Sequence, residues 1–433
     1  MVKRQRTTDN GQQNPWLWIP SLCAAEEIPS AVVTFVALLM LLQFGADEVM
    51  AALYSALLFL PWVTKSYLYS KVRKAASFKR NLHICESLMF LCLMGIAVYI
   101  SEAHVRPWVL FLFLFVLSLL CAWHELLSRL YYSRMLYPRQ QQLFTNTKLL
   151  SSQMALVVTY GVLIIVAGFF EVFFRSYQKA WAMESSLVAG GFMVFLVLNI
   201  LLLRTPKGGN LYRYETLSDT VKNELHVLSR IQQKPHVLPV LLSLFFLLLP
   251  QALMFNTRVF FLLTLPEQGG LGCSVQDVGF AQGTIGVLAF SLGVIGGRAL
   301  MKKYGKSQMF WWTAIVLTLS PVSYMLMAWH PQLDNMLWLC LMTFFAQLCF
   351  GFGLNVCSLY VPYISEQRYR NTTNYLYMPL VISLMLVPLA LSGWLSQWLG
   401  YRVFFTLCAA TALMAWMVVA VCKVKRILAD NRQ

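Results

Sequence analysis

The chain has 433 residues and a formal net charge of +16, and 58% of its residues are hydrophobic whereas only 12% are charged. Soluble domains carry about 25% charged residues, so this composition excludes an ordinary soluble protein. Apolar runs of roughly 18 or more residues recur from end to end, and that length crosses ~30 Å of hydrocarbon. The sequence therefore predicts an all-α membrane protein.

Twelve apolar stretches alternate with polar segments along the chain. As membrane-spanning helices they cover residues 16–43, 49–70, 81–101, 107–128, 147–170, 184–203, 237–264, 276–297, 309–329, 336–363, 373–395 and 402–422. The even number of spans predicts that both termini lie on the same side of the membrane.

Basic residues are distributed very unequally between the two sides that these spans define. Of the 34 Lys and Arg residues, 28 fall in segments on the side of the termini, and Lys65 and Arg258 fall within spans. The other side carries Arg106, Arg175, Lys179 and Arg402. Cytoplasmic loops are enriched in Lys and Arg, so we expect a bacterial inner-membrane protein with both termini in the cytoplasm. Loops of this kind meet anionic lipid, and the net charge does not indicate nucleic-acid binding.

The longest polar stretch divides the spans into two sets of six. We expect an N-terminal half at 1–203, a linker with an amphipathic helix on the inner membrane surface at 204–236, and a C-terminal half at 237–433. The halves correspond, because both their first spans and their first basic loops are offset by roughly 220 residues, and parallel six-span repeats are typical of the major facilitator architecture. In that architecture the solute binds near the midplane between the halves.

Two adjacent carboxylates lie in the first span, Glu26 and Glu27, between Pro20 and Pro29. Ionisable groups inside a membrane are costly and are usually functional, so this pair suits proton coupling or the binding of an amine. Adjacent helical positions point about 100° apart, so both cannot face one cavity equally, and we favour Glu26. The alternative is a helix-end pair near the interface.

The fourth span ends with Glu125 followed one turn later by Arg129. This i, i+4 spacing predicts a salt bridge, which is either structural or a gate that opens during transport. In the third span, Glu86 is expected to pair with Lys79 or His83 near the inner surface.

Two basic residues remain inside spans. We expect Lys65 to snorkel to the inner surface, with gating as the alternative, and Arg258 to snorkel to the outer interface, with the binding of an anionic group as the alternative. Uncharged polar residues also lie in the later spans, namely Gln251, Gln282, Gln347, Asn355 and Asn374. Their amides suit sugar hydroxyls or amide groups, and the alternative is hydrogen bonding between helices. Two GxxxG spacings, made by Gly279, Gly283, Gly293 and Gly297, predict close helix packing.

Motifs of enzymes and metal sites are missing from the sequence. There is no HExxH, GxSxG, P-loop or Cys/His cluster, and we expect no enzyme activity, no cofactor and no metal.

Several segments resemble AmpG-like permeases of the major facilitator superfamily. The resemblance begins with PWLWIPSLCAAEEIP at 15–29 and ALYSALLFLPWVTK at 52–65. It continues with GLGCSVQDVG at 270–279, GTIGV at 283–287, GFG at 351–353 and SGWL at 392–395. The resemblance implies a proton-driven importer of muropeptides, in which Glu26 is the first-span acid and Glu125 belongs to a fourth-span motif. Candidate solute-binding residues are then Glu26, Tyr54, Trp62, Gln251, Gln282, Gln347 and Asn355, and candidate coupling or gating residues are Glu26, Glu27, Lys65, Glu125 and Arg129.

The sequence departs from the family pattern at positions where acids are expected. Those positions hold Arg73, Arg129, Gln251, Lys302 and Ala346. Two hypotheses follow. The first is a monomeric secondary transporter of a small polar solute, with or without protons. The second is a divergent relative that no longer transports and acts as a membrane receptor or scaffold.

Overall fold

The computed structural model describes residues 14–65, 78–102, 104–205, 236–331, 335–364 and 370–430, and within these ranges the regular structure is helical with no strand. Ten helical stretches in this part are long and apolar enough to cross a membrane. One of them, Pro379–Val421, contains two helices that meet at Gly400. With the helix that starts at Glu48, the described residues form the twelve expected helical spans.

The N-terminal half contains the first six spans. The first is built from α1 (Pro15–Ala31), the π-helical η1 (Val32–Val36) and α2 (Ala37–Gln43). The second begins with α3 (Glu48–Leu58) and is helical again over residues 60–65. The remaining elements are α5 (Phe78–Ile100), α6 (Pro107–Met135), α7 (Pro138–Leu143), α8 (Thr145–Leu156), the π-helical η2 (Val157–Leu163), α9 (Ile164–Phe174) and α10 (Tyr177–Leu202).

The C-terminal half contains the other six spans. It starts with α12 (Val237–Leu263), the 3₁₀ turn η3 (Pro266–Gln268), α13 (Val275–Val278), the π-helical η4 (Gly279–Gly286) and α14 (Val287–Tyr304). It continues with α15 (Lys306–Trp329), α16 (Met336–Gly353), the 3₁₀ turn η5 (Leu354–Val356), α17 (Cys357–Ile364), α18 (Arg370–Val421) and α19 (Val424–Asp430).

The predicted spans match these helices closely, and the differences have local causes. The Asp47 side chain accepts a hydrogen bond from the Met50 amide and so caps the start of α3. At residue 400 the backbone has φ of 73°, a conformation that favours glycine, and this turn separates the last two spans. The predicted linker 204–236 lies outside the described residues except at its two ends.

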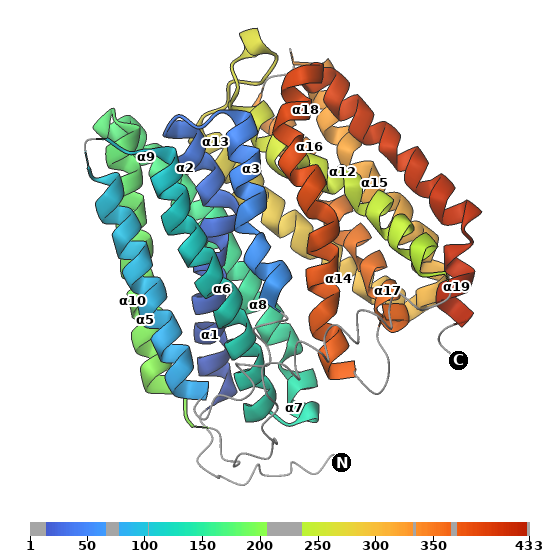
Figure 1. Cartoon of the computed structure of the whole chain (residues 1–433), viewed down its shortest axis with the longest axis horizontal. Coiled ribbons are helices and arrows are strands. Elements are labelled where there is room, and N and C mark those ends of the chain that lie inside the picture. Colours follow the sequence, from blue (N-terminus) through green and yellow to red (C-terminus); the bar gives the residue numbers. More distant parts are fainter. Residues whose placement is uncertain are drawn as a thin grey trace.

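The two halves stand side by side in the bundle. In Figure 1 the elements from α1 to α10 form the left side and those from α12 to α19 form the right side, except for α13, which is labelled between α2 and α3. The start of α1 and the helix α19 lie at the same, lower end of the picture. We call it the basic end, because α6 and α14 also end there and carry Arg134, Lys302 and Lys303 in their last turns. The other end is called the opposite end.

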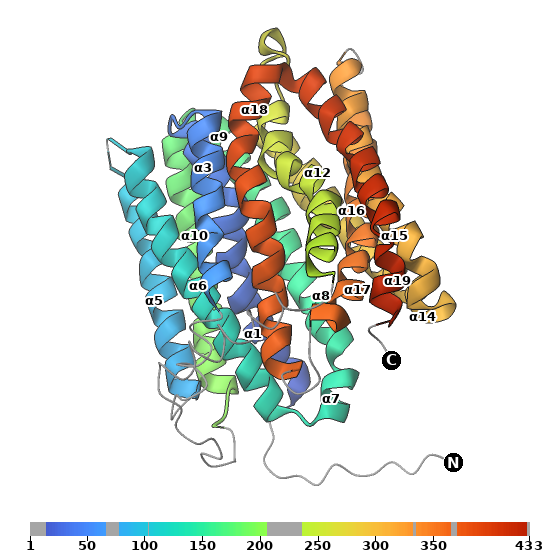
Figure 2. The same cartoon turned by 45° about the vertical axis from the view of Figure 1, so that its right-hand side comes forward.

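Contacts between the halves follow two pairs of spans. Helix α3 packs against α18, and both views show the two helices side by side (Figures 1 and 2). In addition, η2 and α9 pack against η4 and α13. Glycines permit the closest approaches: a Cβ on Gly393 would lie 2.3 Å from the Glu48 carbonyl oxygen, and one on Gly283 would lie 1.7 Å from that of Tyr160.

The four glycines of the GxxxG spacings are all at close helix contacts, as predicted. A Cβ on Gly279 would meet Ile164 at 2.8 Å. Farther along the same span, Cβ atoms on Gly293 and Gly297 would lie 2.3 Å from the Leu348 carbonyl oxygen and from the Asn355 amide nitrogen. The eighth span therefore packs against the N-terminal half with its first part and against α16 with its second.

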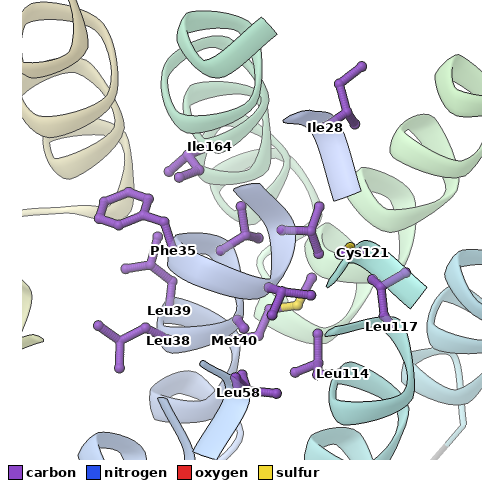
Figure 3. Packing of buried hydrophobic residues seen from close by; sticks show 14 of the residues in the cluster. Ile28, Phe35, Leu38, Leu39, Met40, Leu58, Leu114, Leu117, Cys121 and Ile164 are labelled. Carbon is purple, nitrogen blue, oxygen red and sulfur yellow. The ribbon is translucent and has the colours of Figure 1, made fainter. Parts of the chain in front are cut away.

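Apolar packing fills the centre of the N-terminal half. Figure 3 shows Phe35 and Met40 of the first span among side chains from its neighbours, including Leu58, Leu114 and Ile164, all of which belong to one buried cluster. A helix that is apolar on every side is suited to such a central position. Polar groups on this span are therefore informative where they occur.

Candidate functional site

Glu125 is the centre of a network of charges inside the N-terminal half. Its carboxylate accepts hydrogen bonds from Lys65 Nζ at 2.9 and 3.0 Å and from Trp62 Nε1 at 3.0 Å. It also forms the predicted i, i+4 ion pair with Arg129. Lys65 and Trp62 come from the end of the second span, so this network joins the second and fourth spans.

The expectation that Lys65 snorkels to the inner surface is wrong. Its side chain is only 3% exposed, because the amine reaches the Glu125 carboxylate inside the bundle. An ammonium group in a poorly solvated position needs an anionic partner, and a carboxylate one helix away provides it without the cost of leaving the charge unpaired.

Glu26 and Glu27 point toward different neighbours. Glu26 accepts a short hydrogen bond from Ser128 of α6, whereas Glu27 lies beside Ser152 of α8 and within electrostatic range of Glu125. Both side chains are partly buried. The adjacent carboxylates are therefore held by the fourth and fifth spans respectively, as the angle between adjacent helical positions requires.

Taken together, these groups form a charge-balanced cluster in the N-terminal half. Lys148 of α8 lies within electrostatic range of Glu27 and packs over the ring of Tyr132 at 5.1 Å. The cluster, which we call the acid–base cluster, consists of Glu26, Glu27, Glu125, Lys65, Arg129 and Lys148. Three carboxylates and three cations in one place can exchange protons and partners without a large change in net charge.

Glu86 belongs to a separate network and is itself completely buried, whereas its partner His83 is 16% exposed. It bonds to His83 at 3.3 Å, as expected, but also to His124 at 3.2 Å and to Asn199 at 2.7 Å, and Asn199 in turn accepts a hydrogen bond from Ser21. These contacts tie together four spans of the N-terminal half. The sequence indicated His83 because it lies three residues before Glu86 on the same helix. Contacts with residues on other spans have no such regular spacing and could not be predicted in this way.

In the C-terminal half the candidate amides divide into two groups. Gln282 donates to the Tyr324 hydroxyl at 2.8 Å, and Gln347 approaches Gln282 at 3.5 Å. By contrast, Gln251 donates to the Leu317 carbonyl at 3.0 Å, and Asn355 donates to backbone carbonyls including that of Phe352. Gln282 and Gln347 bond to other side chains and can be rearranged. Gln251 and Asn355 bond to backbone carbonyls and hold the backbones together.

The aromatic candidate Tyr54 stacks on Phe111 of α6, with ring centroids 4.5 Å apart. It therefore packs within the N-terminal half. Within the described ranges, no group of three or more His, Cys, Asp or Glu side chains is arranged to hold a metal ion.

Glu48 forms a contact at the opposite end that sequence reasoning missed. Its carboxylate accepts hydrogen bonds from Thr264 at 3.2 Å, from Ser396 at 3.5 Å and from Tyr401. Glu48 starts α3, and its three partners come from three different parts of the C-terminal half. We call this contact the Glu48 latch, since it fastens the two halves together at that end.

A surface pocket of about 830 Å³ lies next to the Glu48 latch. Its walls include Glu171, Arg175, Cys273 and Gln276 as well as Glu48, so both halves line it. The latch and the pocket show that the halves meet at the opposite end, and the halves also touch farther along the spans, where Ser291 of α14 donates to Gln153 of α8.

Arg258 does not snorkel to a surface either, and this expectation is wrong. Its guanidinium packs 5.2 Å from the ring centre of Phe255 and lies within electrostatic range of Tyr160 and Tyr324, which belong to different halves. The aromatic packing draws this side chain to the interface between the halves.

Comparisons with known proteins show the fold. No protein-family model matches the chain, and no curated protein matches it in sequence. Among solved structures it is similar to the nucleoside transporter NupG, with 14% identity, TM-score 0.69, and 94% of this chain and 98% of that chain covered.

A bacterial homologue of the human lysosomal transporter Spinster, in an inward-facing and unoccupied conformation, has 13% identity and TM-score 0.69, with 96% of this chain and 97% of that chain covered. A peptide transporter POT, in a mutant form in complex with alafosfalin, has 11% identity and TM-score 0.69, with 97% of this chain and 96% of that chain covered. The chain therefore has the fold of the major facilitator transporters.

Proposed function

We propose that this protein is a secondary transporter that moves a small polar solute across the bacterial inner membrane by alternating access. The two moving bodies are residues 1–203 and 237–433, joined by the linker 204–236, with the basic end in the cytoplasm. The solute class favoured by the AmpG-like segments is muropeptides or related sugar-peptides, and protons drive their uptake.

The observation that carries this proposal is the acid–base cluster on a major facilitator fold. Holding ionisable groups inside the bundle costs several kcal/mol for each ion that lacks a partner, and a structural role would be met more cheaply by apolar residues. Such groups inside a membrane protein usually lie on solute or proton pathways. The cluster also joins the first, second, fourth and fifth spans, so a proton taken up there would alter contacts across the whole half.

Similar folds support the transport class. The reported neighbours are transporters of nucleosides and peptides by their titles. The halves of this chain meet at the end opposite to the basic end, which corresponds to a carrier that faces the cytoplasm if the basic end lies there.

The test uses purified protein in liposomes. Uptake of a radiolabelled disaccharide tetrapeptide from peptidoglycan, and of simple sugars and dipeptides, is measured with an imposed pH gradient and, separately, by counterflow without one. We expect gradient-driven uptake in the wild type. The variants Glu26→Gln and Glu27→Gln should lose gradient-driven uptake by about tenfold or more, the range for removing a group that acts in proton transfer, and should keep counterflow.

The matched control is Glu267→Gln, which removes an exposed carboxylate from η3 and should leave both assays unchanged. Equal loss of counterflow and gradient-driven uptake in the Glu26 and Glu27 variants would contradict proton coupling. If no solute of the panel moves in either assay, the receptor or scaffold hypothesis replaces transport.

A further inference from the structure

We infer that Arg258 forms an anion-binding site between the two halves, and that the transported solute carries a carboxylate or phosphate group which this arginine binds. The inference rests on the proposed transport function. It adds a chemical class of solute that the acid–base cluster alone does not specify.

The position of Arg258 is the first argument. It lies on α12 between Thr257 and Val259, both of which have no exposed surface. The residue as a whole is only partly buried, although its Nε atom is enclosed. Its neighbours Tyr160 and Tyr324 belong to the N-terminal and C-terminal halves, so a group bound here touches both moving bodies.

The lack of an anionic partner is the second argument. Within the described part of the chain, Arg258 forms no ion pair, and its Nε atom is enclosed without a hydrogen-bond acceptor. The titratable groups that act on the guanidinium are the phenols of Tyr324 and Tyr160, which are neutral hydrogen-bonding groups. This contrasts with Lys65, whose charge is matched by Glu125.

Energetics turn this contrast into a prediction about a ligand. An arginine stays charged in proteins and presents donors that match a carboxylate or phosphate in a bidentate manner. The contact with the ring of Phe255 offsets only part of the cost of an unpaired ion in a poorly solvated site. A solute anion would supply the missing interaction, and it would do so only while the solute is bound.

Local backbone geometry is the third argument. The π-helical segment η2, which carries Tyr160, packs against the π-helical segments η1 and η4. Thr34 of η1 shares a hydrogen bond with the hydroxyl of Tyr160 in η2. Thr284 of η4 packs against Gly161, the residue after Tyr160, and its Oγ1 atom is buried without a hydrogen-bond partner. π-helical turns occur frequently at functional sites. An unpartnered hydroxyl, that of Thr284, therefore lies against the residue that follows Tyr160, one of the two tyrosines near the arginine.

The test measures binding by the rise in melting temperature of purified full-length protein in detergent. The probes are two matched pairs: N-acetylmuramic acid with N-acetylglucosamine for the carboxylate, and glucose 6-phosphate with glucose for the phosphate. We expect at least one acidic probe to raise the melting temperature of the wild type by about 2 °C or more, while its neutral counterpart does not. The acid that acts identifies which anionic group the site prefers.

Variants show whether the arginine is responsible. Arg258→Gln should lose the response to the acid, Arg258→Lys should keep part of it, and Lys303→Gln, an exposed cation at the basic end, should keep all of it. Without a probe, Arg258→Met should melt at the same temperature as the wild type or higher, because it removes an unpaired ion. A fall of several degrees would show that Arg258 has a structural role instead.

The inference is overturned if neither acid shifts the wild type, if a neutral probe acts as well as its acid, or if Arg258→Gln responds normally. Transport is judged separately by uptake of the same probes into liposomes. Binding of an acid without uptake of any probe would sustain the anion site and remove the transport function. Equal uptake of acid and neutral probe in the wild type and in Arg258→Gln would sustain the transport function and remove the anion site.

Discussion

At the scale of single residues, the ion pairs of the acid–base cluster make a sharp stability prediction. Lys65 is enclosed and bonded to Glu125, which is also bonded to Arg129. The change Glu125→Gln removes the carboxylate that is bonded to the ammonium of Lys65 and should lower the free energy of unfolding by about 3–5 kcal/mol. Thermal melting of the purified protein in detergent measures this loss.

A double variant provides the control. Lys65→Met combined with Glu125→Gln removes both buried charges, so it should melt at a higher temperature than Glu125→Gln alone. Residues in direct contact show such non-additivity, with coupling energies of about 0.5–3 kcal/mol. If the two changes simply add, the ion pair does not stabilise the fold.

Residue by residue, the sequence predicted contacts within a helix better than contacts between helices. The Glu125–Arg129 pair and the Glu86–His83 pair follow from spacing along one helix, and both are present. The sequence predicted that Lys65 and Arg258 lie at surfaces. Their neighbours in the structure, a carboxylate on α6 and aromatic rings at the interface, come from packing between helices, and the spacing of residues along one helix does not encode that packing.

At the scale of elements, the contact between the fifth and eighth spans makes the second prediction. Gly283 in η4 lies so close to η2 that an added methyl group would overlap the Tyr160 carbonyl oxygen. Gly283→Ala must therefore push the two spans apart, at a cost of about 1–3 kcal/mol. Melting temperature and uptake in liposomes should both fall.

Gly296, in the second part of the same span, is the matched control. No atom lies within 4 Å of a Cβ placed on it, so Gly296→Ala should be neutral or stabilise the helix by up to about 1 kcal/mol. Equal melting temperatures for the two alanine variants would show that the spans do not touch where the structure brings them together.

Element boundaries were largely predictable, whereas the π-helical turns were not. Length and apolarity define each span, because the thickness of the hydrocarbon layer sets both. The segments η1, η2 and η4 lie inside such spans and are as apolar as their surroundings, so the extra residue in each turn leaves no mark in the hydropathy pattern.

At the scale of the whole molecule, the Glu48 latch makes the third prediction. Glu48→Ala removes the acceptor for Thr264, Ser396 and Tyr401 and so weakens the contact between the halves at the opposite end. The population of molecules open at that end should rise. Cys273, which lines the neighbouring pocket and is partly buried, should then react several-fold faster with a membrane-impermeant maleimide.

Two further variants make this measurement specific. Cys273→Ser in the Glu48→Ala background should abolish the added labelling. Glu267→Gln removes a carboxylate from the nearby η3 without touching the latch and should label at the wild-type rate. An unchanged labelling rate in Glu48→Ala would mean that other contacts hold the halves together.

The architecture of the whole molecule could be predicted from charge and repeat, but the latch could not. Twelve spans and two halves follow from the apolar pattern and from the basic residues on one side. Glu48 sits at a predicted span boundary, where a carboxylate also caps or solvates a helix start, and only the packed halves show that three hydroxyl groups converge on it.

The unmatched charge of Arg258 has an electrical consequence for the transport cycle. In the proposed transport cycle, the empty carrier would hold one positive charge between its halves, which a bound solute anion would neutralise. Moving one elementary charge through a potential of 100 mV changes the free energy by about 2.3 kcal/mol. The membrane potential should therefore control how fast the empty carrier returns, and the step that carries solute should respond to voltage only through the charge of the protons that accompany the solute.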